Sequence, residues 1–192
     1  SLALRSTRVL TETDIQQLRD LAWESINYGV SNGRSVISVD PTKYSPALQE
    51  RASSFVTLRA GAALRGCMDR LEAETSLIED VARNANNATF HDPRFDPVHQ
   101  EEIDGLDLKL SVLSKPEPFP VESEAELLER IRPGVDGIIL KSGSRKATFL
   151  PAVWEMLSTP AEFIAQLKRK ADLPEDYWSD NIEIQRYRAD EY

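Results

Sequence analysis

Apolar side chains near the start of the chain recur at helical spacing and predict an amphipathic helix over residues 12–28. The stripe consists of Ile15, Leu18, Ala22 and Ile26. These positions share one face when the period is 3.6 residues. Thr11 and Asp14 precede the stripe at the spacing of a capping box, in which two side chains accept backbone N–H groups of the first turn. A helix that begins at this box is therefore expected.

A second stripe of the same period predicts a helix over residues 76–88, again with a capping box, formed here by Ser76 and Glu79. Two shorter helices are predicted with the caps Ser123 and Thr159. The first of these is expected to end at Pro133-Gly134, because proline and glycine interrupt a helical run. The chain is thus predicted to contain several helices of different lengths.

Strict alternation of apolar and polar residues predicts a half-buried strand at residues 106–114. Further strands are predicted at 54–60, 64–71, 137–141, 145–150 and 182–184. Strands and helices do not alternate regularly, so a largely antiparallel α+β fold is favoured over a doubly wound parallel sheet. Two proline-containing segments are predicted to be irregular: a long surface loop at 31–50 and a stiff connector from Pro116 to Pro120.

The length of 192 residues suits one domain. The 32 acidic and 23 basic residues give a net charge of −9. A protein that binds duplex DNA by neutralising phosphates usually has the opposite balance, so no binding of duplex nucleic acid is expected. Residues 51–100 contain arginine but no lysine. Arginine suits two-pronged contacts with carboxylates, and internal ion pairs are the favoured role of these arginines.

Cys67 is the sole cysteine, so no disulfide forms within the chain. No apolar run approaches the ~20 residues of a membrane-spanning helix, and no charged-then-apolar leader opens the sequence. A cytoplasmic protein that does not enter a membrane is therefore expected. Glycine-rich loops that cradle nucleotides and paired cysteines that bind zinc are both missing from the sequence, so no cofactor is predicted.

The segment around Cys67 is the most pointed candidate for chemistry. Gly66 precedes it and permits either a close backbone approach or a positive φ angle beside the thiol. A guanidinium from Arg65 or Arg70 favours the thiolate, the form that nucleophilic and redox chemistry require. The alternative is that Cys67 is a small apolar residue packed on a strand. The spacing alone favours this alternative.

His91 and His99 are the only histidines, and Asp92 and Asp96 lie between them. Prolines in the same segment prevent a helical face of metal ligands, so turn hydrogen bonds by the aspartates are favoured and no metal site is predicted. The basic hairpin tip at 141–146 can contact phosphate. It lacks aromatic residues for stacking on bases and is expected to be a solvated turn.

Several separated motifs resemble the AMMECR domain family. The string FVTLRAGAALRGCMD, residues 55–69, is similar to a family signature in which a phenylalanine-led strand is followed by L-R-G-C-I-G, with Met68 and Asp69 in place of Ile and Gly. Asp92-Pro93-Arg94-Phe95 resembles the family's D-x-R-F element. Further similar positions are Glu102, Leu110–Ser114, Gly134, Gly137, Phe149–Pro151 and the stretch from Phe163 to Trp178. The resemblance covers nearly the whole chain.

The resemblance implies an AMMECR-like α+β fold that fills residues 1–192 as a single domain. A larger lobe, residues 10–75 and 105–192, is expected to hold a mostly antiparallel sheet flanked by helices, and a smaller helical lobe is expected over 76–104. Prokaryotic members resemble the A component of the AmmeMemoRadiSam system. This implies a Memo-like protein and a radical S-adenosylmethionine protein as partners, and it leaves the reaction open.

Two hypotheses for the function remain open. In the first, the protein is a thiol-dependent component whose Cys67 is a nucleophile or a radical-relay thiol, and Glu102 orients an arginine or moves a proton. In the second, it is a non-catalytic binding module whose interlobe cleft holds a partner peptide or a small anionic ligand. Both hypotheses predict one concave surface between the lobes. Cys67 is the candidate catalytic residue of the first hypothesis, and the candidate ligand-binding residues are Arg65, Gly66, Asp92, Arg94 and Glu102.

Overall fold

The computed structural model describes residues 9–69 and 73–192, with the exception of the side chain of Asp69. The chain divides into two compact units. Unit 1 runs to Ser114 and includes Asp190–Tyr192, and unit 2 comprises Lys115–Ala189. Within the described residues, helices accompany two antiparallel four-stranded sheets, so the predicted α+β class is confirmed.

Unit 1 contains two long helices, α1 (Glu12–Ser31) and α3 (Leu77–Phe90). The predicted capping box of α1 is present: the Thr11 side chain accepts from the Asp14 N–H at 3.1 Å, and the Asp14 carboxylate accepts from the Thr11 N–H at 3.0 Å. Ser76 caps α3 by accepting the N–H of Glu79. Both helices confirm the predicted stripes, and each ends slightly later than predicted.

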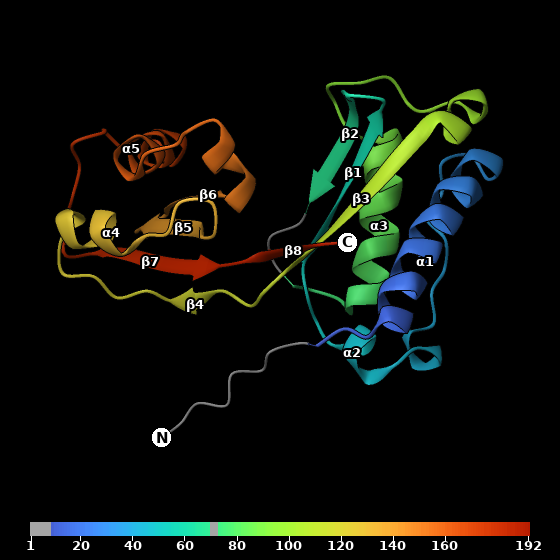
Figure 1. The fold of residues 1–192 in the computed structure, drawn as a ribbon, viewed down its shortest axis with the longest axis horizontal. Coiled ribbons are helices and arrows are strands. Elements are labelled where there is room, and N and C mark those ends of the chain that lie inside the picture. The colour runs from blue at the N-terminus through green and yellow to red at the C-terminus, as the bar shows by residue number, and fades with distance from the viewer. Residues whose placement is uncertain (1–8, 70–72) are drawn as a thin grey trace. The chain divides into compact units, whose positions relative to one another are not determined.

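The sheet of unit 1 consists of β1 (Ser54–Ala60), β2 (Ala63–Asp69), β3 (Leu106–Leu113) and β8 (Ala189–Glu191), in the spatial order β2-β1-β3-β8. β1 pairs antiparallel with both β2 and β3. α3 packs on β1 and β2, and α1 packs on α3, so the helices lie on one face of these strands (Figure 1). Fully buried apolar residues of both layers form the core: Leu18, Ala22, Ile26, Val56, Leu58, Val81, Ala85 and Leu110.

The segment predicted as a surface loop, residues 31–50, is a loop only in part. It contains a 3-10 helix, η1 (Pro41–Lys43), and a short helix, α2 (Pro46–Gln49). Each proline stands in the first turn, where its missing N–H is not needed. Leu48 of α2 is fully buried in the core. The prediction of a continuous surface loop was therefore wrong, because the prolines begin helical turns.

Unit 2 has its own sheet, with the spatial order β4-β7-β5-β6. Its elements are β4 (Glu117–Pro118), α4 (Glu124–Arg130), β5 (Gly137–Ser142), β6 (Arg145–Phe149), η3 (Pro151–Glu155), α5 (Pro160–Lys170) and β7 (Ile182–Tyr187). The predicted β5–β6 hairpin turns at Gly143, whose φ is +61°. A separate core lies here, in which Trp154 stacks on Phe163 with the ring centroids 3.9 Å apart.

Two details of unit 2 differ from the sequence-based expectation. The proline-rich connector contributes an edge strand, because Pro118 pairs with Gln185 at the border of the sheet, where a residue without an N–H is tolerated. α4 ends at Arg130, ahead of Pro133-Gly134. In the part of the chain that the structure describes, no helix has the length and apolar character needed to cross a membrane.

The borders of the two units differ from those of the lobes implied by the family resemblance. Residues 76–104, expected to be a smaller lobe, lie within unit 1, because α3 packs on β1 and β2 and shares their core. Residues 115–189 instead have a core of their own. The single domain expected over residues 1–192 stays a prediction.

Candidate functional site

Cys67 lies on β2, an edge strand of the sheet in unit 1, opposite Thr57 of β1. The Cys67 sulfur is 3.4 Å from the Thr57 hydroxyl oxygen. The residue is half-buried, and within the described residues it is not part of the apolar core. Cys67 thus combines contact with a hydroxyl group and partial access to solvent, unlike a cysteine that only fills a hydrophobic interior.

Gly66 determines how closely β2 approaches α3. A Cβ atom at position 66 would stand 2.0 Å from the carbonyl oxygen of Ala88, a separation that no side chain tolerates. Of the two roles predicted for this glycine, close backbone approach is the one that the structure displays, since its φ is not in the left-handed region. Successive side chains of a strand point to opposite faces, so Cys67 lies on the face turned away from α3.

Asp92 and Arg94 contact the outer edge of β2 at Cys67. The Asp92 carboxylate accepts from the Cys67 N–H at 3.0 Å and from the Arg94 side chain at 3.0 Å (Nε) and 2.8 Å (Nη2). Nη2 of Arg94 also lies 3.4 Å from the Cys67 carbonyl oxygen, to which it donates. One ion pair therefore engages both backbone groups of Cys67 that an edge strand leaves without a neighbouring strand.

The charges of this pair stabilise one another. Hydrogen bonds from the Arg94 side chain hold the pKa of Asp92 well below its usual range, although the Asp92 side chain is only 2% exposed. The Asp92 carboxylate in turn raises the pKa of Arg94, and the neighbouring Cys67 adds to this effect. The Arg94 side chain is 57% exposed, and its Nη1 takes no part in these contacts. Part of a guanidinium that is held at the backbone of Cys67 therefore faces solvent.

Arg65 and Glu102 form a second, two-pronged ion pair. Nε and Nη2 of Arg65 donate to the two carboxylate oxygens of Glu102 at 2.9 and 3.2 Å, and Nη1 donates to the carbonyl oxygen of Asp96 at 2.8 Å. Glu102 lies in the 3-10 helix η2 (Gln100–Gly105). The bonds from Arg65, together with one from the His99 N–H, lower the pKa of Glu102. Arg65 is 16% exposed and holds this segment against β2.

The candidate residues thus come together within unit 1 as two neighbouring groups. The first group is Cys67, Asp92 and Arg94, and the second is Arg65 and Glu102. The Arg65 guanidinium and the Glu102 carboxylate bind each other with two hydrogen bonds. The Arg94 guanidinium of the first group, in contrast, keeps an edge exposed to solvent. A concave surface between lobes stays a prediction, and Arg70, considered above as a partner of the thiol, lies outside the described residues.

Comparison with known proteins identifies the family. The sequence model of the AMMECR1 family matches residues 19–192. The chain belongs to the AMMECR1 family. It is 37% identical over 151 residues to a protein of Methanothermobacter thermautotrophicus (78% of this chain, 79% of the relative) and 33% identical over 187 residues to a protein of Methanocaldococcus jannaschii (90% and 91%). The crystal structure of an uncharacterized protein from Pyrococcus horikoshii matches with a TM-score of 0.79 and 30% identity, covering 96% of this chain and 92% of that one.

In this AMMECR1-family chain the two histidines stand at the ends of helices. His91 ends α3 and donates its N–H to the carbonyl oxygen of Asn87, and His99 begins η2 by accepting the Glu102 N–H at its own carbonyl oxygen. Within residues 9–69 and 73–192, no group of three or more His, Cys, Asp or Glu side chains is arranged to hold a metal ion. Asp92 does make the local bond expected of it, since it accepts the Arg94 N–H two residues on.

Two contributions to the candidate site were missed by reasoning from the sequence. One is Thr57, which the pairing of β1 with β2 places beside the sulfur. The other is the bond from the Cys67 N–H to the Asp92 carboxylate, which joins residues far apart in the sequence. The Asp92-Pro93-Arg94 motif was a usable signal for the ion pair itself, because its residues lie close enough to bond locally.

Proposed function

We propose that this AMMECR1-family protein is a thiol-dependent component of a multiprotein system. In this proposal Cys67 is the reacting group, and Arg94 binds an anionic group of the substrate. The observation that carries this proposal is the Asp92–Arg94 pair, which fixes a half-exposed guanidinium against the backbone of Cys67. A free arginine side chain loses conformational freedom when it binds an anion. The Arg94 side chain is already held by the Asp92 carboxylate, so it loses little further conformational freedom when it binds an anion.

Two groups near Cys67 support a thiolate: the Thr57 hydroxyl at the sulfur and the Arg94 guanidinium at the backbone carbonyl oxygen. A neighbouring guanidinium favours the negatively charged form of a thiol, and the thiolate is the nucleophilic form. A thiolate sulfur can only accept a hydrogen bond, so in this proposal the Thr57 hydroxyl, 3.4 Å from the sulfur, donates to it. Arg94 thus has two roles in this proposal. One edge of its guanidinium contacts Cys67 and favours the thiolate, and the exposed edge binds a carboxylate or phosphate of the substrate.

The proposed setting is the AmmeMemoRadiSam system, with a Memo-like protein and a radical S-adenosylmethionine protein as partners in the cytoplasm. Its support is the resemblance of the LRGCMD and DPRF motifs to the A component of that system. The net charge of −9 supports the further proposal that duplex nucleic acid is not a partner.

A binding module without catalysis is the second candidate. It is favoured by the saturation of the Arg65–Glu102 pair, which leaves Glu102 poorly suited to move a proton, since its carboxylate already accepts from Arg65 and from the His99 N–H. In this case Arg94 still binds a carboxylate or a small anion, and Cys67 contributes only packing.

Thiol reactivity tests the first candidate directly, because Cys67 is the sole cysteine and any alkylation reports on it alone. The rate of alkylation by iodoacetamide is measured against pH for the folded wild-type protein and for Arg94→Gln. A control is Arg132→Gln in unit 2, where a 53% exposed arginine pairs in the same way with Asp136, whose side chain is 1% exposed. We expect Arg94→Gln to slow alkylation near neutral pH about threefold to tenfold.

The control variant should react like the wild type. Equal rates for Arg94→Gln and wild type across the pH range would remove the thiolate proposal and leave the binding module. A faster reaction in Arg94→Gln, if it matches the rate of the denatured protein, would show that the substitution has opened the fold around Cys67, and Arg94 would then be a structural residue.

A further inference from the structure

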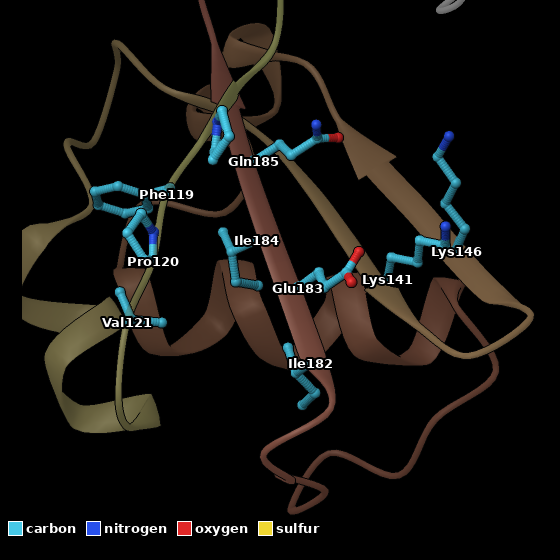
Figure 2. Close-up of a pocket in the computed structure, with 10 residues that line it drawn as sticks. Phe119, Pro120, Val121, Lys141, Lys146, Ile182, Glu183, Ile184 and Gln185 are labelled. Atoms are coloured by element: carbon cyan, nitrogen blue, oxygen red, sulfur yellow. The ribbon is translucent and has the colours of Figure 1, made fainter. Parts of the chain in front are cut away.

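A groove in unit 2 opens after Phe119, where the segment that follows β4 separates from β7. β4 pairs with β7 at Glu117 and Pro118, and the Phe119 N–H still donates to the carbonyl oxygen of Ile184 at 2.8 Å. Pro120 has no N–H, so the ladder cannot continue through it. A groove of about 480 Å³ lies along β7 in this region (Figure 2). Its volume is within the range of about 300–1,000 Å³ that is usual for ligand sites.

The two sides of the groove differ in chemistry. One side is apolar and consists of Pro118, Phe119, Pro120 and Val121, with Ile182 and Ile184 of β7 beside it. The polar side consists of Lys141, Lys146, Glu183 and Gln185. Figure 2 shows Phe119, Pro120 and Val121 on one side of β7 and Lys141 and Lys146 on the other. Phe119 is held firmly, since the guanidinium groups of Arg130 and Arg186 each lie 4.6 Å from its ring centroid.

The polar side carries an excess of positive charge in a chain whose net charge is −9. Lys146 of β6 is the cross-strand partner of Lys141 of β5, which is in turn the partner of Glu183 of β7. Like charges directly opposite each other are unfavourable in a sheet. One carboxylate thus stands in a row with two ammonium groups. An anionic ligand over this row would relieve the repulsion between the lysines.

We propose that the groove binds an extended acidic peptide segment of a partner protein. Both sides of the groove follow β7. A ligand that fits must therefore present apolar groups along one of its edges and acidic groups along the other. In an extended peptide, successive side chains point to opposite sides. A segment in which apolar and acidic residues alternate therefore sets apolar side chains against Pro120 and Val121 and carboxylates over Lys141. The hairpin tip predicted as a solvated turn supplies the cations of this site.

The proposal is independent of the thiol chemistry, because the residues of the groove all belong to unit 2 and Cys67 belongs to unit 1. A short fluorescein-labelled peptide of alternating aspartate and leucine serves as the probe, and binding to the whole chain is followed by fluorescence anisotropy. Its counterpart with asparagine in place of aspartate keeps the shape and removes the charge. We expect saturable binding of the acidic probe, weaker binding at high salt, and little binding of the asparagine probe.

Two variants and one matched control locate the site. Lys141→Glu reverses the central charge, and Gln185→Glu adds a carboxylate of nearly the same size as the amide it replaces; each should weaken binding about tenfold or more. Lys43→Glu changes an exposed lysine of unit 1 in the same way and should leave binding unchanged. Circular dichroism checks that each variant is folded. If Lys141→Glu does not fold, the near-isosteric Gln185→Glu still tests the proposal.

Specific outcomes overturn the proposal. It fails if no saturable binding of the acidic probe is seen up to millimolar protein, if the asparagine probe binds equally well, or if the folded groove variants bind like Lys43→Glu. Binding that persists in Cys67→Ser and is lost in Gln185→Glu would establish the groove whatever the fate of the thiol hypothesis.

Discussion

The backbone of Gly66 in β2 lies against the backbone of Ala88 in α3, so close that a Cβ atom on the glycine would be 2.0 Å from the Ala88 carbonyl oxygen. This contact fixes the strand that carries Cys67 to the helix that precedes Asp92. Since α3 ends at Phe90, the chain reaches the edge of β2 within two residues and can place its carboxylate on the Cys67 N–H. One close approach thus sets the position of two parts of the site.

Gly66→Ala is therefore expected to destabilise the protein by about 2–4 kcal/mol, because a methyl group cannot fit against a backbone oxygen unless the strand or the helix moves. Gly105→Ala is the matched control: a Cβ there meets no atom within 4 Å. We expect its unfolding free energy to stay within about 0.5 kcal/mol of wild type. Urea denaturation measures both. Equal effects of the two substitutions would contradict the role assigned to the Gly66–Ala88 contact.

The pairing of Thr57 with Cys67 shows what sequence reasoning could not reach. The two strands, at 54–60 and 64–71, were predicted from the sequence, and the structure joins them through a turn at Gly61. Counting back from the turn places Thr57 opposite Gly66, but the register shifts between Leu58 and Arg59, so Thr57 faces Cys67. A bulge of this kind depends on local twist and has no reliable sequence signal. It also leaves Arg65 outside the β1–β2 register.

Asp92 should make stability depend on pH in the acidic range. Its pKa in the folded protein lies well below the value of about 4 usual for an unfolded chain. The carboxylate therefore contributes stability above that value, and the contribution is lost as the pH falls toward the folded-state pKa. We expect Asp92→Asn to cost about 1–3 kcal/mol at pH 7, with a smaller difference from wild type at pH 3.

Chemical denaturation at the two pH values checks this expectation for Asp92. Asp107→Asn, at an exposed position of β3, provides the control and should change the unfolding free energy little at either pH. A difference between wild type and Asp92→Asn that is as large at pH 3 as at pH 7 would refute the proposed role of the ionised carboxylate.

The Arg65–Glu102 pair should show measurable coupling in a double-mutant cycle with alanine at each position. The pair is two-pronged and Arg65 is mostly buried, but Glu102 is 37% exposed, so solvent reduces its strength. We expect a coupling of about 1 kcal/mol, and a clearly smaller coupling for the exposed pair Arg130–Glu126 on α4. Coupling energies in the reverse order would mean that geometry and burial do not govern these pairs.

The arginines of this region illustrate a second limit of sequence reasoning. Arginine without lysine correctly indicated ion pairs, and both Arg65 and Arg94 form one. Their partners were predictable to different degrees: Asp92 is two residues from Arg94, so turn chemistry brings them together. Glu102 is 37 positions from Arg65, and only the folding of the segment after α3 along the edge of β2 makes the contact.

Duplex DNA should not bind. With nine more acidic than basic residues, the protein repels a polyanion, and any binding through phosphates would weaken steeply with salt. Titration of a labelled duplex of arbitrary sequence at physiological salt should therefore give no saturable change in anisotropy. Saturable binding that falls as salt is raised would show that a local basic surface outweighs the overall charge.

Arg94→Lys separates a binding role from a purely structural one. A lysine ammonium is a point charge that cannot hold Asp92 with two prongs and still offer a fixed edge to an anion. In the proposed complex, assembled from co-purified partners, activity or anion retention should drop clearly. Stability should change by only about 1 kcal/mol or less, as the side chain is 57% exposed.

Arg132→Lys is the comparison for Arg94→Lys, because it alters a similarly exposed arginine paired with a buried aspartate in unit 2. If the two variants lose similar stability and neither affects the assembled complex, Arg94 only fastens a loop to β2. If Arg94→Lys alone impairs the complex while Cys67→Ser retains full activity, the guanidinium binds a ligand and the thiol does not react. That combination would select the binding module over the thiol-dependent component, because both hypotheses use Arg94 to bind an anion and only the first needs a reactive Cys67.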